Sequence, residues 1–209
     1  INKALYDKIA PGDFRHKSFL SPDRSTWTSG TYKFAGNAAA QNAFLNSLAK
    51  PYTAIKFRPV AGEVNTYTIG NPADHMLMRV EEMYFIEMEA ISNYDLGQAK
   101  TLLNEFMALR VTDGSYDCSE ITDLSRFTTE MLIQKRIEFW GEGVLLFDYK
   151  RLDEPIDRSA SNHATVFKLK TERRSPQWNL VITRVEFQSN LAINDDTNND
   201  DPSEKIAQP

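Results

Sequence analysis

Apolar positions with helical spacing are concentrated in the middle of the chain. Asp74 is a residue type that caps helices, and we expect a helix from there to about Ser92. A helix that is apolar nearly all round is buried on several sides, so this one is expected to lie inside the fold. The apolar residues that cover most of its circumference are Met76, Leu77, Met78, Val80, Met83, Tyr84, Phe85, Ile86 and Met88.

Two further helices are predicted beyond the break at NYDLG. The first runs from about Leu96 to Arg110, and the short turn before it predicts an antiparallel helix pair. The second is a long helix from Ser119 through Glu142. These helices make the middle of the chain, residues 73–152, a helical core, and the predicted fold class is mainly α.

The segment EFWGEGVLLFDYKRL, residues 138–152, continues the long helix with an unusual composition. It contains Gly141 and Gly143, and each glycine costs about 1 kcal/mol against alanine inside a helix. Acids and basic residues flank the glycines, while apolar residues lie on several faces. The face that extends back into the preceding helix consists of Ile133, Ile137, Trp140 and Val144.

The two flanking regions have weaker patterns. Residues 1–72 are rich in turn signals and form a predicted loop-rich region, with one helix at 38–48 and short strands at 52–57 and 63–69. Residues 153–209 are polar, and the alternation at 165–170 and 178–183 predicts a small β-hairpin followed by a solvated tail.

Composition and charge narrow the classes of function. The chain has 209 residues, of which 41% are hydrophobic and 25% charged, which is ordinary for a folded protein. The net charge of −5 and the lack of a basic cluster argue against a nucleic-acid partner. No stretch is long and apolar enough to cross a bilayer. The chain opens at Ile1 without an initiator methionine or signal peptide, which is expected of a processed product, a designed chain or a proteolytic fragment.

Candidate catalytic residues are few. The single cysteine, Cys118, excludes an internal disulfide, and the three histidines are too scattered to suggest a thiol nucleophile. A catalytic carboxylate pair is disfavoured because the candidate acids share one helix, whereas such pairs line a cleft from separate elements. We expect these acids to pair with Arg79, Arg136 or Arg151. The acids are Glu81, Glu82, Glu87 and Glu89.

Metal and cofactor signals are also absent from the sequence pattern. The acidic tail DDTNNDD lacks the glycine and glutamate of an EF-hand, because those positions hold Asp201 and Ala207. Two interpretations of this segment stay open: it binds calcium as an irregular loop, or it is a mobile polar tail. There is no zinc-ligand spacing, no phosphate-binding loop and no G-x-S-x-G motif. We expect no metal and no cofactor.

Four aromatic residues stand among the turns of the first region: Trp27, Tyr32, Tyr52 and Tyr67. An aromatic ring on a loop can stack on the apolar face of a sugar, but it can equally fill the core beneath the loop. The sequence leaves both alternatives open. We take Trp27, Tyr32 and Tyr67 as the candidate ligand-binding residues.

Several segments resemble the SusD/RagB-like proteins. LMRVEEMYFIEMEA, residues 77–90, is similar to that family's R-x-A-E-x-Y-L-x-x-A-E-A helix, and QKRIEFWGEGVLLFDYKR, residues 134–151, is similar to its E-R-x-x-E-L-x-x-E-G-x-R-x-x-D-L-x-R motif. Gln134 and Leu145 replace the family's usual Glu and Arg. The matching residues that the resemblance marks as structural are Arg79, Glu82, Glu89, Glu138, Glu142, Gly143, Asp148 and Arg151.

Three other segments match in the same order along the chain. LYDKIAPGDFR, residues 5–15, resembles the family's L-Y-D-x-x-x-x-x-D-x-R, and IKFRP, residues 55–59, resembles its K-F segment. SPQWNLVITRVEFQSNLAINDD, residues 175–196, is similar to the terminal I-P-Q-x-E-I-x-x-N-P stretch. The five matches in order identify the chain as similar to the C-terminal portion of this family.

The resemblance implies a mainly α fold with tetratricopeptide-like helix pairs and a loop-rich ligand face. It implies a non-catalytic lipoprotein on the cell-surface side of the outer membrane, with its lipid anchor outside this chain. Its ligand would be an oligosaccharide or another nutrient, and its partner a SusC-like TonB-dependent transporter. The glycines of residues 138–152 would then allow close helix packing, and the acids and arginines would form a buried network.

Two alternatives to this function remain at the level of sequence. One is a helical scaffold that docks on the transporter without touching sugar, which a large exposed apolar patch without aromatics would favour. The other is a glycan-active hydrolase, which an open cleft with two carboxylates would favour. Exposed aromatics on one loop face would favour nutrient capture.

Overall fold

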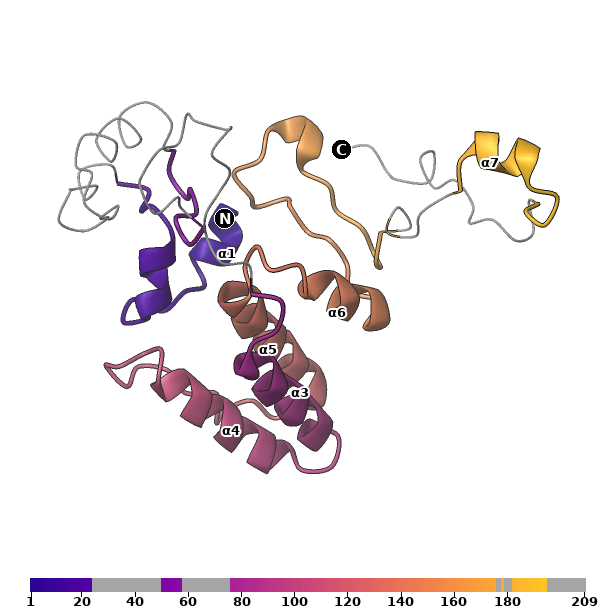
Figure 1. Ribbon diagram of the computed structural model, residues 1–209. Coiled ribbons are helices and arrows are strands. Elements are labelled where there is room, and N and C mark those ends of the chain that lie inside the picture. The colour runs from indigo at the N-terminus through magenta and orange to yellow at the C-terminus, as the bar shows by residue number, and fades with distance from the viewer. Residues whose placement is uncertain (24–49, 58–75, 176–177, 179–181, 195–209) are drawn as a thin grey trace. The chain divides into compact units, whose positions relative to one another are not determined.

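The described part of the chain is mainly helical. The computed structural model describes residues 1–23, 50–57, 76–175, 178 and 182–194, which fall into two compact units, Ile1–Gly143 and Val144–Pro209 (Figure 1). Within these residues there are helices and isolated β-bridges but no strands, so the predicted mainly α class is confirmed. The SusD-like and tetratricopeptide-like details stay predictions. No helix in the described ranges is long and apolar enough to span a membrane.

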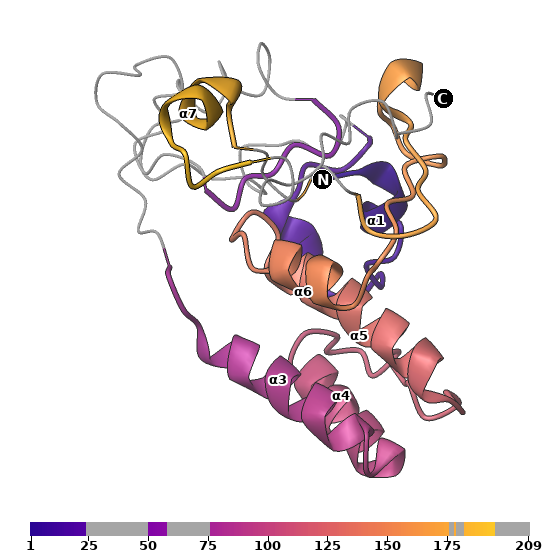
Figure 2. The ribbon, with the colours of Figure 1, turned by 90° about the vertical axis from the view of Figure 1, so that its right-hand side faces the viewer.

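The predicted antiparallel pair is present as α3 (Val80–Ser92) and α4 (Leu96–Ala108). The two helices lie side by side in both ribbon views (Figures 1 and 2). The Asp95 carboxylate accepts a hydrogen bond of 2.9 Å from the Gln98 backbone N–H, which starts α4 directly after a short turn. The rings of Phe85 and Phe106 meet edge to face, with centroids 4.9 Å apart, and join the buried faces of the pair.

Helix α3 differs from its prediction in two ways. It begins at Val80 rather than after Asp74, which lies outside the described residues, and Arg79 precedes it in an extended conformation. It is also buried on one side only, because Phe85, Met88 and Ser92 recur at helical spacing and share one face. The other apolar side chains, 45–62% exposed, are Val80, Met83, Tyr84 and Ile86. The prediction of burial on several sides is therefore wrong.

The predicted long helix is shorter at both ends. Helix α5 runs from Leu124 to Glu138, and Asp123 caps it by accepting a 2.9 Å hydrogen bond from the Arg126 N–H. Residues before the cap cannot join the helix, because the Asp117 carboxylate holds Ser119 in a turn at 2.8 Å. The chain turns after α5, and a separate helix, α6, spans Leu145–Arg151.

The two glycines of the turn after α5 do not mediate helix packing. Gly141 and Gly143 have φ of +80° and +85°, a conformation that costs other residues roughly 1–2 kcal/mol. A Cβ at Gly141 would also lie 2.6 Å from a ring carbon of Phe57, whereas Gly143 faces open space. The expectation of close helix–helix contact is wrong, because the neighbour of Gly141 belongs to a loop.

The N-terminal segment packs on the end of α5. Helix α1 (Lys3–Tyr6) is followed by the 3-10 helix η1 (Phe14–Ser18), and α1 contacts α5. A small core forms there from Leu5, Ile9, Phe19 and Ile137, with Trp140 partly buried against it. The predicted strand 52–57 is reduced to one bridge between Phe19 and Ala54. The predicted helix 38–48 and strand 63–69 lie outside the described residues.

The second unit contains α6, the 3-10 helix η4 (Thr165–Phe167) and α7 (Arg184–Ser189). Thr165–Phe167 therefore do not form the first strand of the predicted hairpin, because the Phe167 N–H donates locally to the Ala164 carbonyl at 2.8 Å. Much of the second predicted strand lies outside the described residues, as does the acidic tail. A single bridge between Asp157 and Lys170 orders this region.

Candidate functional site

Charged side chains from five separate places meet at the C-terminal end of α5. Glu138, whose side chain is 9% exposed, lies at the centre of this group. Its carboxylate contacts Arg79 at 3.0 Å, Arg110 at 3.3 Å and Arg15 at 3.4 Å. We call the whole group the ionic cluster, which comprises Asp13, Arg15, Lys56, Arg79, Glu81, Arg110, Glu138 and Glu142.

Arg79 is the residue that joins the two motif acids. Its guanidinium donates to both carboxylate oxygens of Glu142, at 2.9 and 3.0 Å, and to a carboxylate oxygen of Glu138 at 3.0 Å. It also donates to the Glu138 backbone carbonyl at 3.0 Å, as Lys56 does at 2.9 Å. Two cations thus lie at the C-terminus of α5, where the helix dipole favours positive charge. Lys56 also forms an ion pair with Glu142.

Aromatic rings support Arg79, which precedes α3, and Arg110, which follows α4. The Arg79 guanidinium lies over the Phe139 ring at 4.5 Å, and that of Arg110 lies over the Phe106 ring at 3.7 Å. Phe85 packs edge-on against both rings. The cluster therefore stands on the aromatic core of the α3, α4 and α5 helices, whose rings contact its arginines through cation–π interactions.

A chain of hydrogen bonds extends the cluster along α5. Arg15 donates to Asp13 at 2.6 Å and to the Gln134 side-chain oxygen at 2.6 Å. The Gln134 amide donates to Glu130 at 2.8 Å, and the Tyr116 hydroxyl donates to the same Glu130 oxygen at 2.9 Å. Gln134 thus accepts from a cation and donates to an acid, which a glutamate could not do while ionised.

In the cluster, the opposite charges around Glu138 and Arg79 favour the ionised forms of these two residues. Burial raises the pKa of the Glu138 carboxyl, but the arginines around it outweigh burial and place the pKa below its ordinary value. Burial lowers the pKa of Arg79, yet hydrogen bonds to Glu142 and Glu138 raise it overall. Burial and the charge of Glu130 raise the pKa of Tyr116.

The cluster contains four cations, Arg15, Lys56, Arg79 and Arg110, and four anions, Asp13, Glu81, Glu138 and Glu142. The cluster therefore contains equal numbers of opposite charges in mutual contact. The arrangement fits a structural role, because a buried charge must be paired to be tolerated.

The residues predicted to be structural are distributed between the two units. Arg79, Glu138 and Glu142 come together in the ionic cluster. Asp148 and Arg151 pair with each other at 2.8 Å within α6. Gly143 lies in the turn after α5. Glu82 and Glu89 lie on α3 and are not among the residues that define the cluster.

Among the acids of α3, Glu81 joins the cluster. It contacts Arg79 at 3.4 Å and Arg110 at 3.7 Å. The pairing of Glu81 with Arg79 was expected, whereas Arg110 was not foreseen as a partner. The signal for Arg110 was its position directly after an apolar helix, where the helix dipole and terminal carbonyls favour a cationic side chain.

The candidate ligand-binding residues Trp27, Tyr32 and Tyr67 lie outside the described residues. Tyr52, the fourth loop aromatic, is described and packs edge to face against Tyr6, with centroids 5.2 Å apart. For Tyr52 the structure thus favours the core-filling alternative over a sugar platform.

Among the described residues, no group of three or more His, Cys, Asp or Glu side chains could hold a metal ion. Comparison of the chain with protein-family models, with curated proteins and with solved structures gives no match.

Proposed function

We propose that this chain is the C-terminal portion of a SusD/RagB-like lipoprotein that captures an oligosaccharide at the cell surface. In this proposal the protein is anchored to the outer membrane by a lipid outside this chain. It delivers its ligand to a SusC-like TonB-dependent transporter. The captured ligand is not chemically changed.

One observation carries the proposal. Four of the segments that resemble the family contribute a charged residue to the ionic cluster, namely Arg15, Lys56, Arg79 and Glu138. A chance resemblance gives no reason for four separate segments to meet in space. Their meeting is expected if the motif residues are retained to hold one fold together.

In the proposed capture mechanism, the helices form a rigid scaffold and the loops bind the ligand. The ionic cluster and its aromatic support fix α3, α4 and α5, and ligands commonly bind to loops that a rigid scaffold positions. Trp27, Tyr32 and Tyr67 are the proposed contacts, because an aromatic ring can stack on a neutral sugar while hydrogen bonds fix its orientation.

A second candidate function is a protein-docking scaffold, which one observation favours. The non-aromatic apolar side chains Val80, Met83 and Ile86 of α3 are exposed to solvent. Large exposed apolar patches mark interaction sites in many proteins. A hydrolase function is disfavoured, because Glu138 and Glu142 of the ionic cluster both form ion pairs with Arg79.

The test is calorimetric titration of the protein with a panel of neutral and acidic oligosaccharides. We expect saturable binding of at least one neutral glycan, with no release of reducing sugar over time. Release of reducing sugar that Glu82→Gln or Glu142→Gln abolishes in a folded protein would favour the hydrolase. Absence of binding to every glycan would leave the docking scaffold as the better function.

A further inference from the structure

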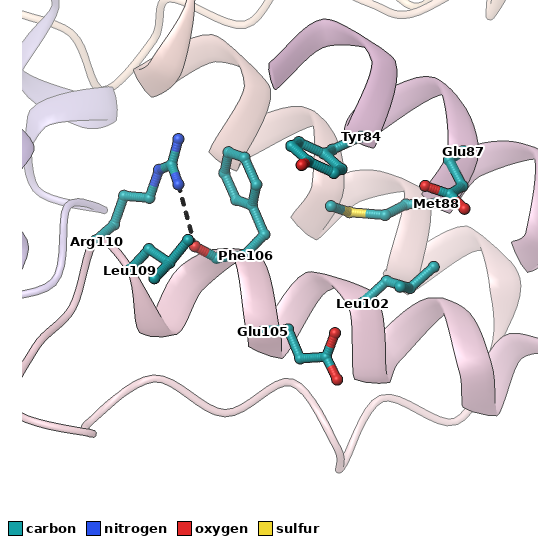
Figure 3. A pocket seen from close by; sticks show the side chains of 8 residues that line it. All are labelled: Tyr84, Glu87, Met88, Leu102, Glu105, Phe106, Leu109 and Arg110. Carbon is teal, nitrogen blue, oxygen red and sulfur yellow. Dashed lines mark hydrogen bonds between the residues drawn. The ribbon is translucent and has the colours of Figure 1, made fainter. Parts of the chain in front are cut away.

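A groove of about 230 Å³ lies between α3 and α4 (Figure 3). Its floor consists of Met88 and Phe106, which are buried. Tyr84 and Leu109, 48% and 69% exposed, stand at its sides, and Leu102 lines it from α4. Large apolar side chains thus surround a space open to solvent.

The acidic side chains at this groove are not neutralised by the described part of the chain. Glu87 from α3 and Glu105 from α4 line it and are exposed. Among the described ion pairs none includes either acid. Arg110 lines the opposite end, but it donates to the Phe106 carbonyl and contacts Glu138 (Figure 3). The groove therefore combines an apolar floor with a surplus of negative charge.

A helix lying along the α3–α4 pair could place side chains in this groove. It runs between two antiparallel helices of 13 residues, each about 20 Å long at 1.5 Å per residue. Side-chain ridges on such a pair accept the ridges of a third helix, and an occupant of about three turns would match the length. A row of apolar residues at i, i+4 and i+7 would face Tyr84, Leu102 and Leu109, which line the groove and are at least partly exposed.

We propose that the α3–α4 groove docks an amphipathic helix of a partner protein, whose apolar residues are flanked by lysine or arginine. The apolar side chains fill the floor, and the basic side chains pair with Glu87 and Glu105. This docking is separate from nutrient binding at the loops and does not depend on it.

A second copy of this chain is a poorer occupant. If the same groove faced itself, Glu87 and Glu105 of one copy would approach the same acids of the other. Like charges brought together oppose association, whereas a basic partner is attracted to the same surface. Charge complementarity therefore selects a basic helix.

The experiment measures binding of three synthetic fluorescent helical peptides of equal length by anisotropy. One peptide is amphipathic and basic, the second has the same apolar face with glutamates, and the third is basic with serines on that face. We expect the first to bind at least about tenfold more tightly than the others and to weaken as salt rises. Equal binding of the acidic peptide, or binding of none, would overturn the proposal.

Two variants test whether the peptide binds in the groove. Glu87→Gln with Glu105→Gln should weaken the basic amphipathic peptide about fivefold to tenfold, since two exposed ion pairs are lost. Leu109→Ser, at an exposed position, should weaken it with little effect on folding. Glu172→Gln, an exposed acid of the second unit, is the matched control and should change nothing.

Two results would contradict the docking of a basic helix in this groove. An unchanged affinity in the double variant would place the peptide elsewhere and reject the groove. Self-association of the protein in sedimentation runs, abolished by Leu109→Ser, would assign the groove to a second copy instead. Either result overturns the proposal without bearing on glycan binding, which the calorimetric titration measures separately.

Discussion

Arg79 and Glu142 form a two-pronged contact across 63 residues of sequence, with hydrogen bonds of 2.9 and 3.0 Å. Arg79 immediately precedes α3, and Glu142 lies in the turn that follows α5. The Glu142 side chain is only 8% exposed, and a buried charge is tolerated when it is paired, here with Arg79 and Lys56. The pair fixes the start of one helix against the end of another.

We expect Arg79→Met to lower the free energy of unfolding by about 3–5 kcal/mol, because it leaves buried carboxylates with fewer partners. Arg79→Lys should recover only part of this loss, since an ammonium cannot donate to Glu142 through two fixed N–H groups. The control is Arg173→Met, which removes an exposed partner of Asp153 and should cost less than about 1 kcal/mol. Chemical denaturation measures all three. Equal losses for Arg79→Met and Arg173→Met would contradict the role given to Arg79.

The two glycines after α5 should respond differently to alanine. Gly143→Ala should cost about 1–2 kcal/mol, the price of a positive φ for an L-residue in open space. Gly141→Ala should cost more, about 2–4 kcal/mol, because its Cβ would also collide with the Phe57 ring. A double-mutant cycle with Phe57→Ala isolates the collision, and the cost of Gly141→Ala should fall in that background. Identical costs in both backgrounds would show that φ alone matters.

Neighbouring aromatics at the end of α5 should contribute unequally to stability. Phe139 is fully buried between Phe85 and the Arg79 guanidinium, so Phe139→Ala should cost about 3–5 kcal/mol. Trp140 is only partly buried, edge-on to Phe19 at 5.5 Å, so Trp140→Ala should cost about 1–3 kcal/mol. Thermal or urea unfolding of the two variants tests the order. A larger loss for Trp140→Ala would mean that Trp140 is the main core residue of this segment.

Stability should fall in mildly acidic solution because of His16. Burial lowers the pKa of His16 below 6.5, although Asp13 opposes the shift, so the folded protein disfavours the imidazolium. Below pH 6.5 the unfolded state then binds more protons, and stability is lost as pH falls through the lowered pKa. Unfolding free energies of the wild type and His16→Gln across this range provide the test. A parallel pH dependence in both proteins would assign the effect to other groups.

A second loss is expected at lower pH from Glu138. Its pKa lies below 4.5 in the folded protein, so its contribution is complete above that value and disappears as pH falls through the folded pKa. Glu138→Gln should remove this acidic component, at the cost of lower stability at neutral pH. An unchanged acid-unfolding curve in that variant would contradict the shift.

The proposed sugar contacts predict a separation of binding from stability. Trp27→Ala, Tyr32→Ala or Tyr67→Ala should weaken glycan binding several-fold and leave the melting temperature nearly unchanged. Tyr94→Ala, at a 92% exposed tyrosine of the α3–α4 turn, is the control that should affect neither. A residue that fills the core would instead lower the melting temperature, by about 2–4 °C per kcal/mol lost. For a neutral glycan, binding should also be insensitive to salt.

The sequence predicted the α3–α4 pair well because the period of apolar residues and the turn signals are local properties. The prediction was wrong at the helix ends, because single side chains determine where a helix begins and ends. Asp123 ends the predicted extension of α5 by accepting from Arg126, and Asp117 forms a competing turn with Ser119. Such local hydrogen bonds compete with helix formation, and the spacing of apolar residues does not reveal them.

The sequence predicted that a buried ionic network exists, but it did not predict which residues pair within that network. Acids and arginines in an apolar context indicate a buried network, but not which side chains meet. Glu138 contacts Arg15 and Arg110, which are 123 and 28 residues away. Only the folded chain brings these together. The exposed side of α3 was missed for a related reason, since an apolar pattern does not say whether a neighbour is present.

The position of Glu138 also bears on how fast the protein folds and unfolds. Its contacts with Arg15, Arg79 and Arg110 close loops of very different length, and long loops carry an entropic cost that delays their closure. We therefore infer that the cluster assembles after the local α3–α4 pair. Interactions that form after the rate-limiting step mainly slow the reverse reaction. The cluster thus sets the lifetime of the native state more than the speed with which that state is reached.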